Sequence, residues 1–584
     1  MKKTLDIFTI TTQEGQSCTL TRSAEQNGIA EYEFQLSWTP ENAAADDAFE
    51  ITWCEPCHGM MYKWDATCDL HRSVYVHWDD AFPSMISVNA PVTCYFDGSD
   101  SNRYCWALSE CKKLVQIKNA FDDLNGFLTP SFILKTAQFT GQFSTSVTLR
   151  IDKRPVSMGC AVADAAAWWS NDLEITPAYV PAAARDPLYS FWYSHHQQVS
   201  APAVEEECAR AKDLGFEICI VDDGWHTEDC GGSFWYCGDW KPAPTKFPDM
   251  AAHVRRVHEI GMKYILWYGV PLMGHRSKNY ERFRGMFLRD EPGLNSSLLD
   301  PRYREVREFL INTYTTALKD WDLDGFKLDF IDVWKPSPDN APYNESMDIP
   351  ALQDAVDVCM TEIKNQLSVL KPDILLEFRQ CYIGPHMKHF GNMFRVGDCA
   401  ANYLKNRATI LDLRMMMGEQ AVHSDMLMLA PSEAPEINAI QIISCMFGVL
   451  QYSGRLEEQS TDALEMSRFW LSFLKTHKDL LLSPKLKAYE AHLLYTWAKV
   501  TQGNECAIGV YAIDKCVQPD AVDTIYIANG CTGKRILLEL EGSYQVQILD
   551  CRGYEQDFFT KDFSGISTLP VPVGGLVVLH KAAE

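Results

Sequence analysis

Residues 321–332 read WDLDGFKLDFID, a strand-like run that carries charge where a buried strand should carry none. Alternation places the apolar side chains of Phe326 and Leu328 on one face, and Lys327 and Asp329 together on the other. Burying an ammonium and a carboxylate is costly unless the two are paired or used. A structural ion pair at a strand end is one interpretation. We favour a catalytic nucleophile at Asp329 with Lys327 beside it, because charges inside barrels concentrate at functional sites.

Apolar runs of four to seven residues alternate with amphipathic segments on both sides of this stretch. That alternation is typical of repeated βα units, so it predicts an α/β fold with a central (β/α)8 TIM barrel over residues 186–481. The predicted strands are residues 190–193, 218–221, 264–267, 325–329, 374–377, 394–397, 423–426 and 449–452. The predicted helices are residues 203–214, 249–260, 303–319, 351–370, 404–417 and 464–477.

The regions on either side of the barrel have short alternating strands instead. Residues 1–180 predict an N-terminal β-sandwich domain, and Pro181 and Pro187 mark the linker that follows it. Residues 482–584 return to short strands with Gly and Asn turns, which predicts a small C-terminal β-sandwich domain. Strand-like runs in the first region include residues 31–38, 73–78, 93–98 and 146–152.

Composition narrows the class of protein. The 584 residues are 46% hydrophobic and 22% charged, as in ordinary globular proteins, and the net charge of -25 argues against a nucleic-acid partner. Many of the 20 cysteines lie in apolar runs, as reduced thiols do in a cytoplasmic protein. Asp6 interrupts any signal-peptide core, and no run reaches the roughly 18 apolar residues of a membrane span. We therefore expect a cytoplasmic protein with no membrane partner, and homo-oligomerisation stays open.

Two cysteine patterns need a separate interpretation. Cys54-Glu55-Pro56-Cys57-His58 matches c-type haem attachment and half of a zinc knuckle, yet no second Cys or His pair follows at zinc-ribbon spacing. We interpret it as a loop with two thiols. Cys230 and Cys237 flank a loop beside the expected pocket, and a reducing compartment favours free thiols there as well. The sequence therefore predicts no cofactor and no metal site.

Carboxylates and aromatic side chains gather at the carboxyl ends of the predicted strands, where a barrel forms its active site. Aromatic faces stack on the C–H face of a pyranose, while carboxylates bind hydroxyls and act at C1. This combination predicts an oligosaccharide or glycoside substrate. In chain order the strand ends carry Trp192, Tyr193, His195 and His196; Asp222, Asp223 and Trp225; Trp267; Lys327 and Asp329; Glu377, Arg379 and Gln380; Arg395 and Asp398; and His423, Ser424 and Asp425.

Glycosidic cleavage needs two carboxyl groups, one to attack C1 and one to protonate the leaving oxygen. Lys327 favours the charged form of Asp329, which suits a nucleophile. Asp398 is our acid/base, because it follows a strand end and the Gly397 turn can aim it at the pocket. Asp425 competes for that role, because it also lies at a strand end.

The acidic pair Asp222 and Asp223 precedes Gly224, and Asp-Gly alone is common in turns. Two adjacent acids followed by Gly and Trp after an apolar strand are more than a turn requires, so we favour binding of sugar hydroxyls.

Seven stretches together resemble glycoside hydrolase family 36, the α-galactosidases of clan D. Their order matches the family over about residues 185–455. The resemblance implies that the aspartate of K-x-D, Asp329, is the nucleophile, and that Asp398 after the sixth strand is the acid/base. It also implies that Asp222 and Asp223 bind the O4 and O6 side of a galactose, with Trp267 in the sugar platform. The stretches are VDDGWH, GDWKPAPTKFPDM, GMKYILWYG, LLDPRYREVREF, DGFKLDF, LLEFRQC and FRVGDC.

Three departures from the family affect the choice of sugar. An E-x-C-x-x-G-G stretch usually follows the fifth strand, whereas residues 377–381 read EFRQC. The acidic E-P-E stretch after the third strand is replaced by residues 268–271, YGVP, and Cys399 stands where Asn usually follows the acid/base. Arg379 could meet a carboxylate, a sulfate or another substituent on the substrate, or it could pair with Glu377 or Asp398.

We therefore expect a retaining exo-α-glycosidase that hydrolyses terminal α-galactosides through Asp329 and Asp398. The expected substrate-binding residues are Asp222, Asp223, Trp267, Lys327, Trp192, Trp225, Glu377, Arg379 and Arg395. The alternatives are an α-N-acetylgalactosaminidase, galactosyl transfer of the raffinose-synthase type, and a carbohydrate-binding protein without catalysis. The presence of both carboxylates argues against the last of these.

Overall fold

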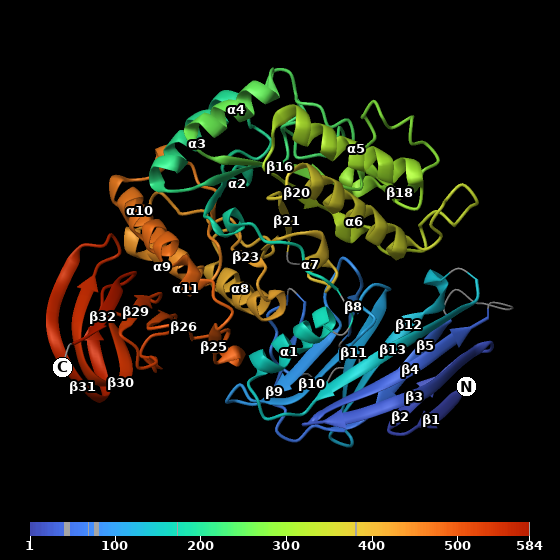
Figure 1. The fold of residues 1–584 in the computed structure, drawn as a ribbon, viewed down its shortest axis with the longest axis horizontal. Helices are drawn as coiled ribbons and strands as arrows, with labels where there is room; N and C mark the ends of the chain where they lie inside the picture. Colours follow the sequence, from blue (N-terminus) through green and yellow to red (C-terminus); the bar gives the residue numbers. More distant parts are fainter. Residues whose placement is uncertain are drawn as a thin grey trace.

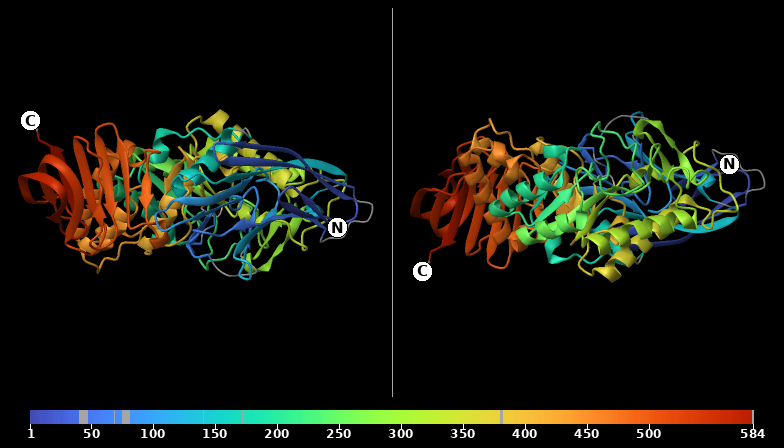
Figure 2. Two further views of the ribbon diagram at one scale, coloured as in Figure 1. Left: turned by 90° about the horizontal axis from the view of Figure 1, so that it is seen from below. Right: turned by 90° about the horizontal axis from the view of Figure 1, so that it is seen from above.

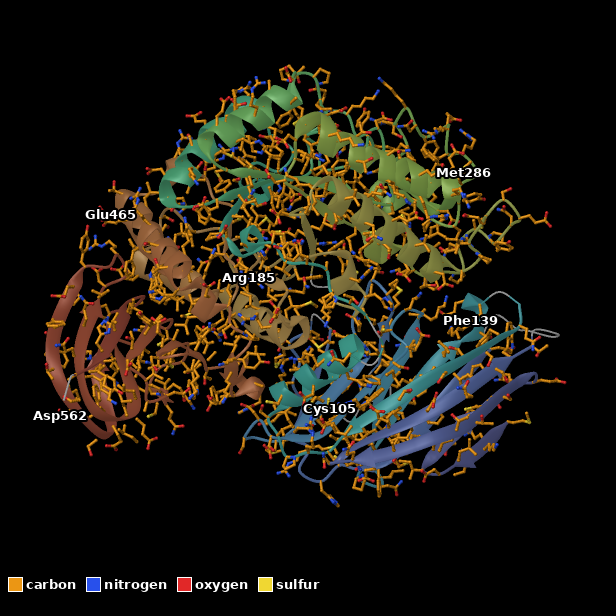
Figure 3. The ribbon with its side chains drawn as sticks, in the orientation of Figure 1. Cys105, Phe139, Arg185, Met286, Glu465 and Asp562 are labelled. Carbon is orange, nitrogen blue, oxygen red and sulfur yellow. The ribbon has the colours of Figure 1, made fainter. Side chains whose placement is uncertain are left out.

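The computed structural model describes residues 1–39, 47–67, 69–74, 81–139, 141–171, 173, 175–379 and 382–582. Two β-rich regions flank a central barrel, and the C-terminal sheet lies at one end of the molecule (Figures 1 and 2). Side chains fill the space between the ribbons in all three parts (Figure 3). None of the helices in the described ranges has both the length and the apolar character that a membrane span requires.

The predicted barrel is confirmed. Eight strands lie side by side in one sheet, each parallel to its neighbours, in the order β23-β22-β21-β20-β16-β15-β14-β24. Parallel bridges from His423 to Val449 and from Leu427 to Tyr452 connect the two ends, so the sheet nearly closes. The strands are β14 (Leu188–Ser190), β15 (Ile218–Val221), β16 (Lys263–Gly269), β20 (Gly325–Asp329), β21 (Leu375–Arg379), β22 (Met393–Arg395), β23 (Ala421–His423) and β24 (Gln451–Tyr452).

Helices follow most of these strands, as the amphipathic segments predict. The main helices are α3 (Ala201–Leu214), α4 (Met250–Ile260), α5 (Arg304–Trp321), α6 (Leu352–Leu370), α8 (Tyr403–Met417), α9 (Pro435–Ser444) and α10 (Thr461–Thr476), and short turns form α2 (Trp192–His195), α7 (Met387–Phe390) and α11 (Lys478–Leu481). A small sheet of β17 (Leu272–Gly274), β19 (Ser296–Leu299) and β18 (Phe287–Glu291) lies between β16 and α5 in the chain. The predicted strand bounds are correct for β15 and β20 and shifted by one to three residues elsewhere.

The N-terminal region forms two facing sheets with an apolar core. Phe8 packs edge-on against Phe34, and Trp53 packs edge-on against Trp106, which joins side chains of the two sheets. One sheet has the order β1 (Lys2–Leu5), β2 (Phe8–Thr11), β5 (Ala48–Trp53), β12 (Phe127–Lys135), β11 (Val115–Asp122) and β8 (Ala81–Ser84), with β6 (Glu55–Pro56) on β12. The other has the order β3 (Gln16–Gln26), β4 (Ile29–Trp38), β13 (Phe143–Asp152), β10 (Asn102–Leu108), β9 (Val92–Phe96) and β7 (Tyr62–Asp65).

Two details of this region differ from the sequence prediction. Residues 73–78 were expected to be a strand, but most of that run lies outside the described residues. Helix α1 (Met158–Asn171) falls inside the stretch expected to be all β, and it lies against β9, β10 and helix α8 of the barrel (Figure 1). Its alanine-rich sequence favours a helix.

The C-terminal region is one continuous sheet of eight strands around its own apolar core. Its order is β25 (Lys487–Tyr489), β26 (Trp497–Gln502), β27 (Glu505–Val510), β29 (Thr524–Asn529), β32 (Leu576–Lys581), β30 (Arg535–Leu549) and β28 (Cys516–Val517), with β31 (Glu555–Pro570) on β30.

A buried polar cluster ties the three regions together. Asp412 of α8 accepts hydrogen bonds from Trp64 Nε1 at 2.9 Å, from Arg72 Nη2 at 2.6 Å and from the Tyr495 hydroxyl at 2.5 Å. Trp64 and Arg72 come from the N-terminal region, and Tyr495 precedes the C-terminal sheet. Burial opposes the charge on Arg72, but Asp412 outweighs it and raises the pKa of the guanidinium.

We expect Asp412→Ala to lower the free energy of unfolding by about 3 to 5 kcal/mol, because it leaves the Arg72 cation buried without its carboxylate. Scanning calorimetry would measure the loss. Glu206→Ala is the control: Glu206 pairs with Arg210 at 2.7 Å on the surface, where their side chains are 67% and 35% exposed, and its removal should cost less than about 1 kcal/mol. Equal losses in the two variants would contradict a central role for Asp412.

Candidate active site

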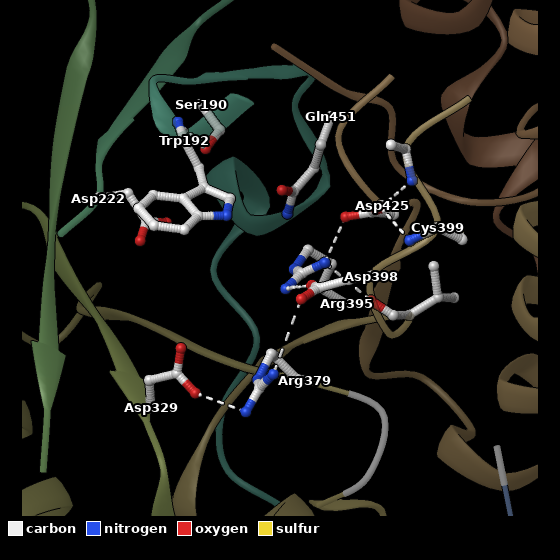
Figure 4. A network of polar contacts seen from close by, with 12 residues as sticks. Ser190, Trp192, Asp222, Asp329, Arg379, Arg395, Asp398, Cys399, Asp425 and Gln451 are labelled. Carbon is white, nitrogen blue, oxygen red and sulfur yellow. Dashed lines mark hydrogen bonds and ion pairs between the residues drawn. The ribbon is translucent and has the colours of Figure 1, made fainter. Parts of the chain in front are cut away.

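The proposed site residues gather at the carboxyl ends of neighbouring strands, as the barrel prediction requires. Asp222 and Asp223 follow β15, and Trp267 lies in β16. Six further predicted residues come from the next three strands: Lys327 and Asp329 in β20, Glu377 and Arg379 in β21, Arg395 in β22, and Asp398 three residues beyond it. Figure 4 shows Asp329, Arg379, Asp398 and Arg395 linked in one polar network. Gln380, which was also expected here, lies outside the described residues.

Asp329 is only 7% exposed and is held by four donors. Its Oδ1 accepts from the Tyr382 hydroxyl at 2.9 Å and from the Phe330 N–H at 2.8 Å, and pairs with Arg379 Nη2 at 2.9 Å. Its Oδ2 accepts from Trp267 Nε1 at 3.1 Å. Since Oδ1 takes three of these donors, Oδ2 is the oxygen with spare lone-pair capacity.

Opposing effects act on the pKa of Asp329. Burial works to raise it, whereas the cations of Arg379 and Lys327 work to lower it. Hydrogen bonds from Trp267 and Tyr382 add to the cations, so the pKa is held well below its ordinary value. Asp329 is therefore a buried carboxylate that stays ionised.

Asp398 has a more open environment, with 53% of its side chain exposed. Its Oδ1 accepts from Arg395 Nη2 at 2.8 Å, and Arg379 Nη1 lies 4.0 Å from its Oδ2. Partial burial works to raise the pKa of Asp398, but Arg395 outweighs it and lowers the pKa below the usual range. A single guanidinium, that of Arg379, thus spans both proposed catalytic carboxylates.

Asp425, the competitor for the acid/base role, is fully buried. It pairs with Arg395 Nη1, accepts from the Tyr193 hydroxyl at 3.1 Å, and accepts from the backbone N–H groups of Cys399 and Ala400 at 2.6 Å each. These contacts fix the turn that carries Asp398. Asp425 therefore holds the neighbouring turn in place.

Asp222 and Asp223 have different partners. Lys327 Nζ donates to Asp222 Oδ2 at 2.5 Å, and burial outweighs that cation to raise the pKa of Asp222. Asp223 accepts from Gln197 Nε2 at 2.6 Å and lies 3.0 Å from His226 Nε2. Gly224 adopts a φ of +111°, and a Cβ there would lie 2.5 Å from the Gln197 backbone, so this turn requires glycine.

Glu377 lies fully buried beside this group. Gln451 Nε2 donates to its Oε2 at 2.6 Å, and Arg395 Nε lies 3.9 Å from its Oε1. Burial raises the pKa of Glu377 against the opposing cations of Lys327 and Arg395.

The predicted tryptophans Trp192 and Trp225 differ in how far they are buried. Trp192 lies in the short helix α2, not in a strand, and it is partly exposed at the pocket (Figure 4). Trp225 is fully buried, and its Nε1 donates to the Trp267 carbonyl at 2.9 Å. It supports Trp267 from within the core.

Several neighbours of the site were not predicted. Tyr382 and Gln197 lie in loops with no distinguishing pattern, whereas Gln451 is a buried amide within a predicted apolar strand, an anomaly that could have marked it. Of the two ambiguous histidines, His195 pairs with the Ser194 hydroxyl and His196 is exposed. In the described ranges no cluster of His, Cys, Asp and Glu could hold a metal ion, and the 18 cysteines there are free thiols.

The fold and the site together define the class of structure. It is a (β/α)8 barrel flanked by β-sheet regions, with two carboxylates bridged by an arginine at the carboxyl ends of its strands. No protein-family model matches the chain. The chain is 29% identical over 206 residues to α-galactosidase Mel36A of Lactobacillus acidophilus, covering 33% of this chain and 27% of that protein. It is also 29% identical over 154 residues to an A type blood α-D-galactosamine galactosaminidase of Flavonifractor plautii, covering 23% of this chain and 14% of that protein.

Solved structures match the fold over nearly the whole chain. The family 36 α-galactosidase AgaA of Geobacillus stearothermophilus superposes with a TM-score of 0.61 at 14% identity, covering 98% of this chain and 81% of that one. A variant of AgaA has been solved in complex with raffinose. The resemblance to the α-galactosidases of glycoside hydrolase family 36 is therefore confirmed in sequence and in fold, while the sequence alignments span about a quarter or less of the two curated relatives.

The opposite pKa shifts of two neighbouring aspartates predict opposite changes in acid stability. The pKa of Asp329 is lowered in the folded state, so its stabilisation is lost as pH falls below about 4. Burial raises the pKa of Asp332 in the folded state, so the contribution of Asp332 to stability increases as pH falls. Between about pH 5 and pH 3, Asp329→Asn should make the pH dependence of the melting temperature shallower, and Asp332→Asn should make it steeper. Slopes that change in the same direction in both variants would contradict these assignments.

Proposed function

We propose that this protein is a retaining exo-α-glycosidase that hydrolyses terminal α-galactosides of oligosaccharides. The observation that carries the proposal is Asp329, a buried carboxylate kept ionised at the end of β20 with spare lone pairs on Oδ2. Lines of support are the resemblance to family 36 and the raffinose complex of the related AgaA. The chemistry would belong to the barrel, residues 186–481, with residues 1–180 and 482–584 as flanking domains.

In the proposed mechanism Asp329 Oδ2 attacks C1 from one face of the sugar, while Asp398 protonates the glycosidic oxygen. Asp398 then takes a proton from the water that hydrolyses the glycosyl-enzyme. Arg395 favours the ionised form of Asp398, which is the wrong state for an acid. A bound sugar would exclude water from this half-exposed carboxylate and so raise its pKa toward the range that a general acid needs.

Asp329→Ala should lower kcat on 4-nitrophenyl α-galactoside by more than about 10⁴-fold, because the first chemical step loses its nucleophile. Azide should restore turnover and give β-galactosyl azide, since the small anion fills the space of the carboxylate and inverts C1. Product anomers would be assigned by NMR. Turnover by Asp329→Ala close to that of the wild type would exclude Asp329 as nucleophile.

The loss of activity caused by Asp398→Ala should depend on the leaving group of the substrate. Loss of the general acid should lower kcat/KM on raffinose by about 10² to 10⁴-fold. An activated 2,4-dinitrophenyl galactoside needs little protonation, so its kcat/KM should fall far less. Azide should now give α-galactosyl azide by attack on the glycosyl-enzyme. Equal losses on both substrates would assign the acid to another residue.

A further inference from the structure

Arg379 is fixed between the two carboxylates that act at C1 in the proposed reaction. Its Nη2 pairs with Asp329 Oδ1 at 2.9 Å and donates to the Tyr382 hydroxyl at 2.8 Å, while its Nη1 faces Asp398 Oδ2 at 4.0 Å (Figure 4). The guanidinium also lies over two aromatic rings, 5.3 Å from the centroid of Tyr382 and 5.7 Å from that of Phe330. With these four neighbours its position is set before any sugar binds.

The charge on Arg379 restricts how a pyranose can lie beside it. The anomeric carbon has two ring neighbours, the ring oxygen and C2, and only C2 carries a substituent. In the oxocarbenium-like transition state positive charge develops on C1 and on the ring oxygen. A fixed cation beside the ring oxygen would oppose that charge, so a productive sugar turns its C2 side toward the guanidinium.

We propose that Arg379 contacts the substituent at the 2-position of the sugar. The site then binds glycosides with a free 2-hydroxyl and excludes 2-amino and 2-acetamido sugars. The inference rests on the function proposed above and names the substrate class of the same site. The guanidinium donates to the 2-hydroxyl oxygen and so fixes the orientation of this side of the ring.

The same geometry excludes the other substituents. A 2-ammonium group would place a second cation against Arg379, and like charges at contact distance are repelled. A 2-acetamido group needs room where the guanidinium, Phe330 and Tyr382 already lie. The specificity would thus differ from the activity named for the Flavonifractor plautii relative, which is a galactosaminidase.

A preference for an anionic sugar, which an arginine in the pocket also suggests, fits the charges poorly. Lys327, Arg379 and Arg395 are the cations of the described network. Five carboxyl groups lie against them, namely Asp222, Asp329, Glu377, Asp398 and Asp425. Each of the three cations already pairs with at least one of these carboxylates. A carboxylate or sulfate on the substrate would therefore enter a pocket that is acidic overall.

The test compares kcat/KM for 4-nitrophenyl α-galactoside, its 2-deoxy analogue and its 2-amino-2-deoxy analogue at about pH 6, where the amine is protonated. The wild type should prefer the 2-hydroxy substrate over both analogues. Arg379→Ala should reduce each preference by about 10- to 100-fold, because a hydrogen bond to a charged group is lost. Any effect of the variant on Asp329 lowers all three rates alike and cancels in the ratios.

Two further variants separate the hydrogen bond from the charge and from general damage. Arg379→Lys keeps the cation, so it should still reject the 2-amino sugar while losing part of the 2-hydroxyl preference. Arg276→Ala removes another ring-stacked arginine, 4.4 Å from the Trp235 centroid, and should leave the ratios unchanged. Circular dichroism would confirm that each variant is folded.

The outcomes are distinct. If Arg379→Ala and Arg379→Lys lower all three rates equally and leave the ratios at the wild-type values, Arg379 only positions Asp329 and the inference fails. A wild type that prefers the 2-amino sugar overturns it as well. If the wild type cleaves no α-galactoside at all, the proposed function itself fails, which is a different result from unchanged ratios in an active enzyme.

Discussion

The buried negative charge of Asp329 is the constraint on which the site depends. A carboxylate can remain ionised in the centre of a barrel only where donors and cations surround it. Strand β20 lies between β16 and β21, so Trp267 reaches the carboxylate from one side and Arg379 from the other. The parallel register places Gly269 beside Asp329, which brings the end of β16 level with the carboxylate. The charge on Asp329 is therefore stabilised only when β16 and β21 pair with β20 in the closed sheet.

A second buried charge organises the other half of the pocket. Arg395 is almost fully buried and pairs with Asp398 on one side and Asp425 on the other. Asp425 in turn accepts from the backbone N–H groups of Cys399 and Ala400. Asp398 is thus held on a fixed turn with its carboxylate half exposed, while the counter-charge stays inside. This arrangement keeps Asp329 buried and ionised while Asp398 stays half exposed to solvent.

The sequence predicted the framework better than the contacts. Apolar runs marked the barrel strands, because strands buried on both faces must be apolar, and β15 and β20 came out at their true bounds. Local pattern could not place Trp192, since the chain leaves the sheet at Ser190 and forms a single helical turn. Trp225 shows the same limit, because whether an indole faces a pocket or the core depends on packing from distant elements.

Tyr382 and Gln451 were missed for a related reason. Both act through contacts between residues far apart in the chain, from Tyr382 to Asp329 and from Gln451 to Glu377. No spacing rule links such pairs before the barrel closes. Conversely, Arg379 could be noticed from the sequence as a departure from the family pattern, but its partner among Glu377, Asp398 and the substrate depends on its position in the fold. The structure places it 2.9 Å from Asp329, a partner that was not predicted, and 4.0 Å from Asp398.

The position of Arg379 links reactivity to specificity in a way that a neutral residue there would not. The guanidinium lowers the pKa of the nucleophile and, in our inference, also contacts the sugar. A substitution that admits a bulkier 2-substituent would therefore remove a cation from Asp329 at the same time. Lys327 could not compensate, because its Nζ is already paired with Asp222 at 2.5 Å. Tyr382 already donates to Asp329, so a change of specificity at this position would need a new donor from a neighbouring strand to retain a competent nucleophile.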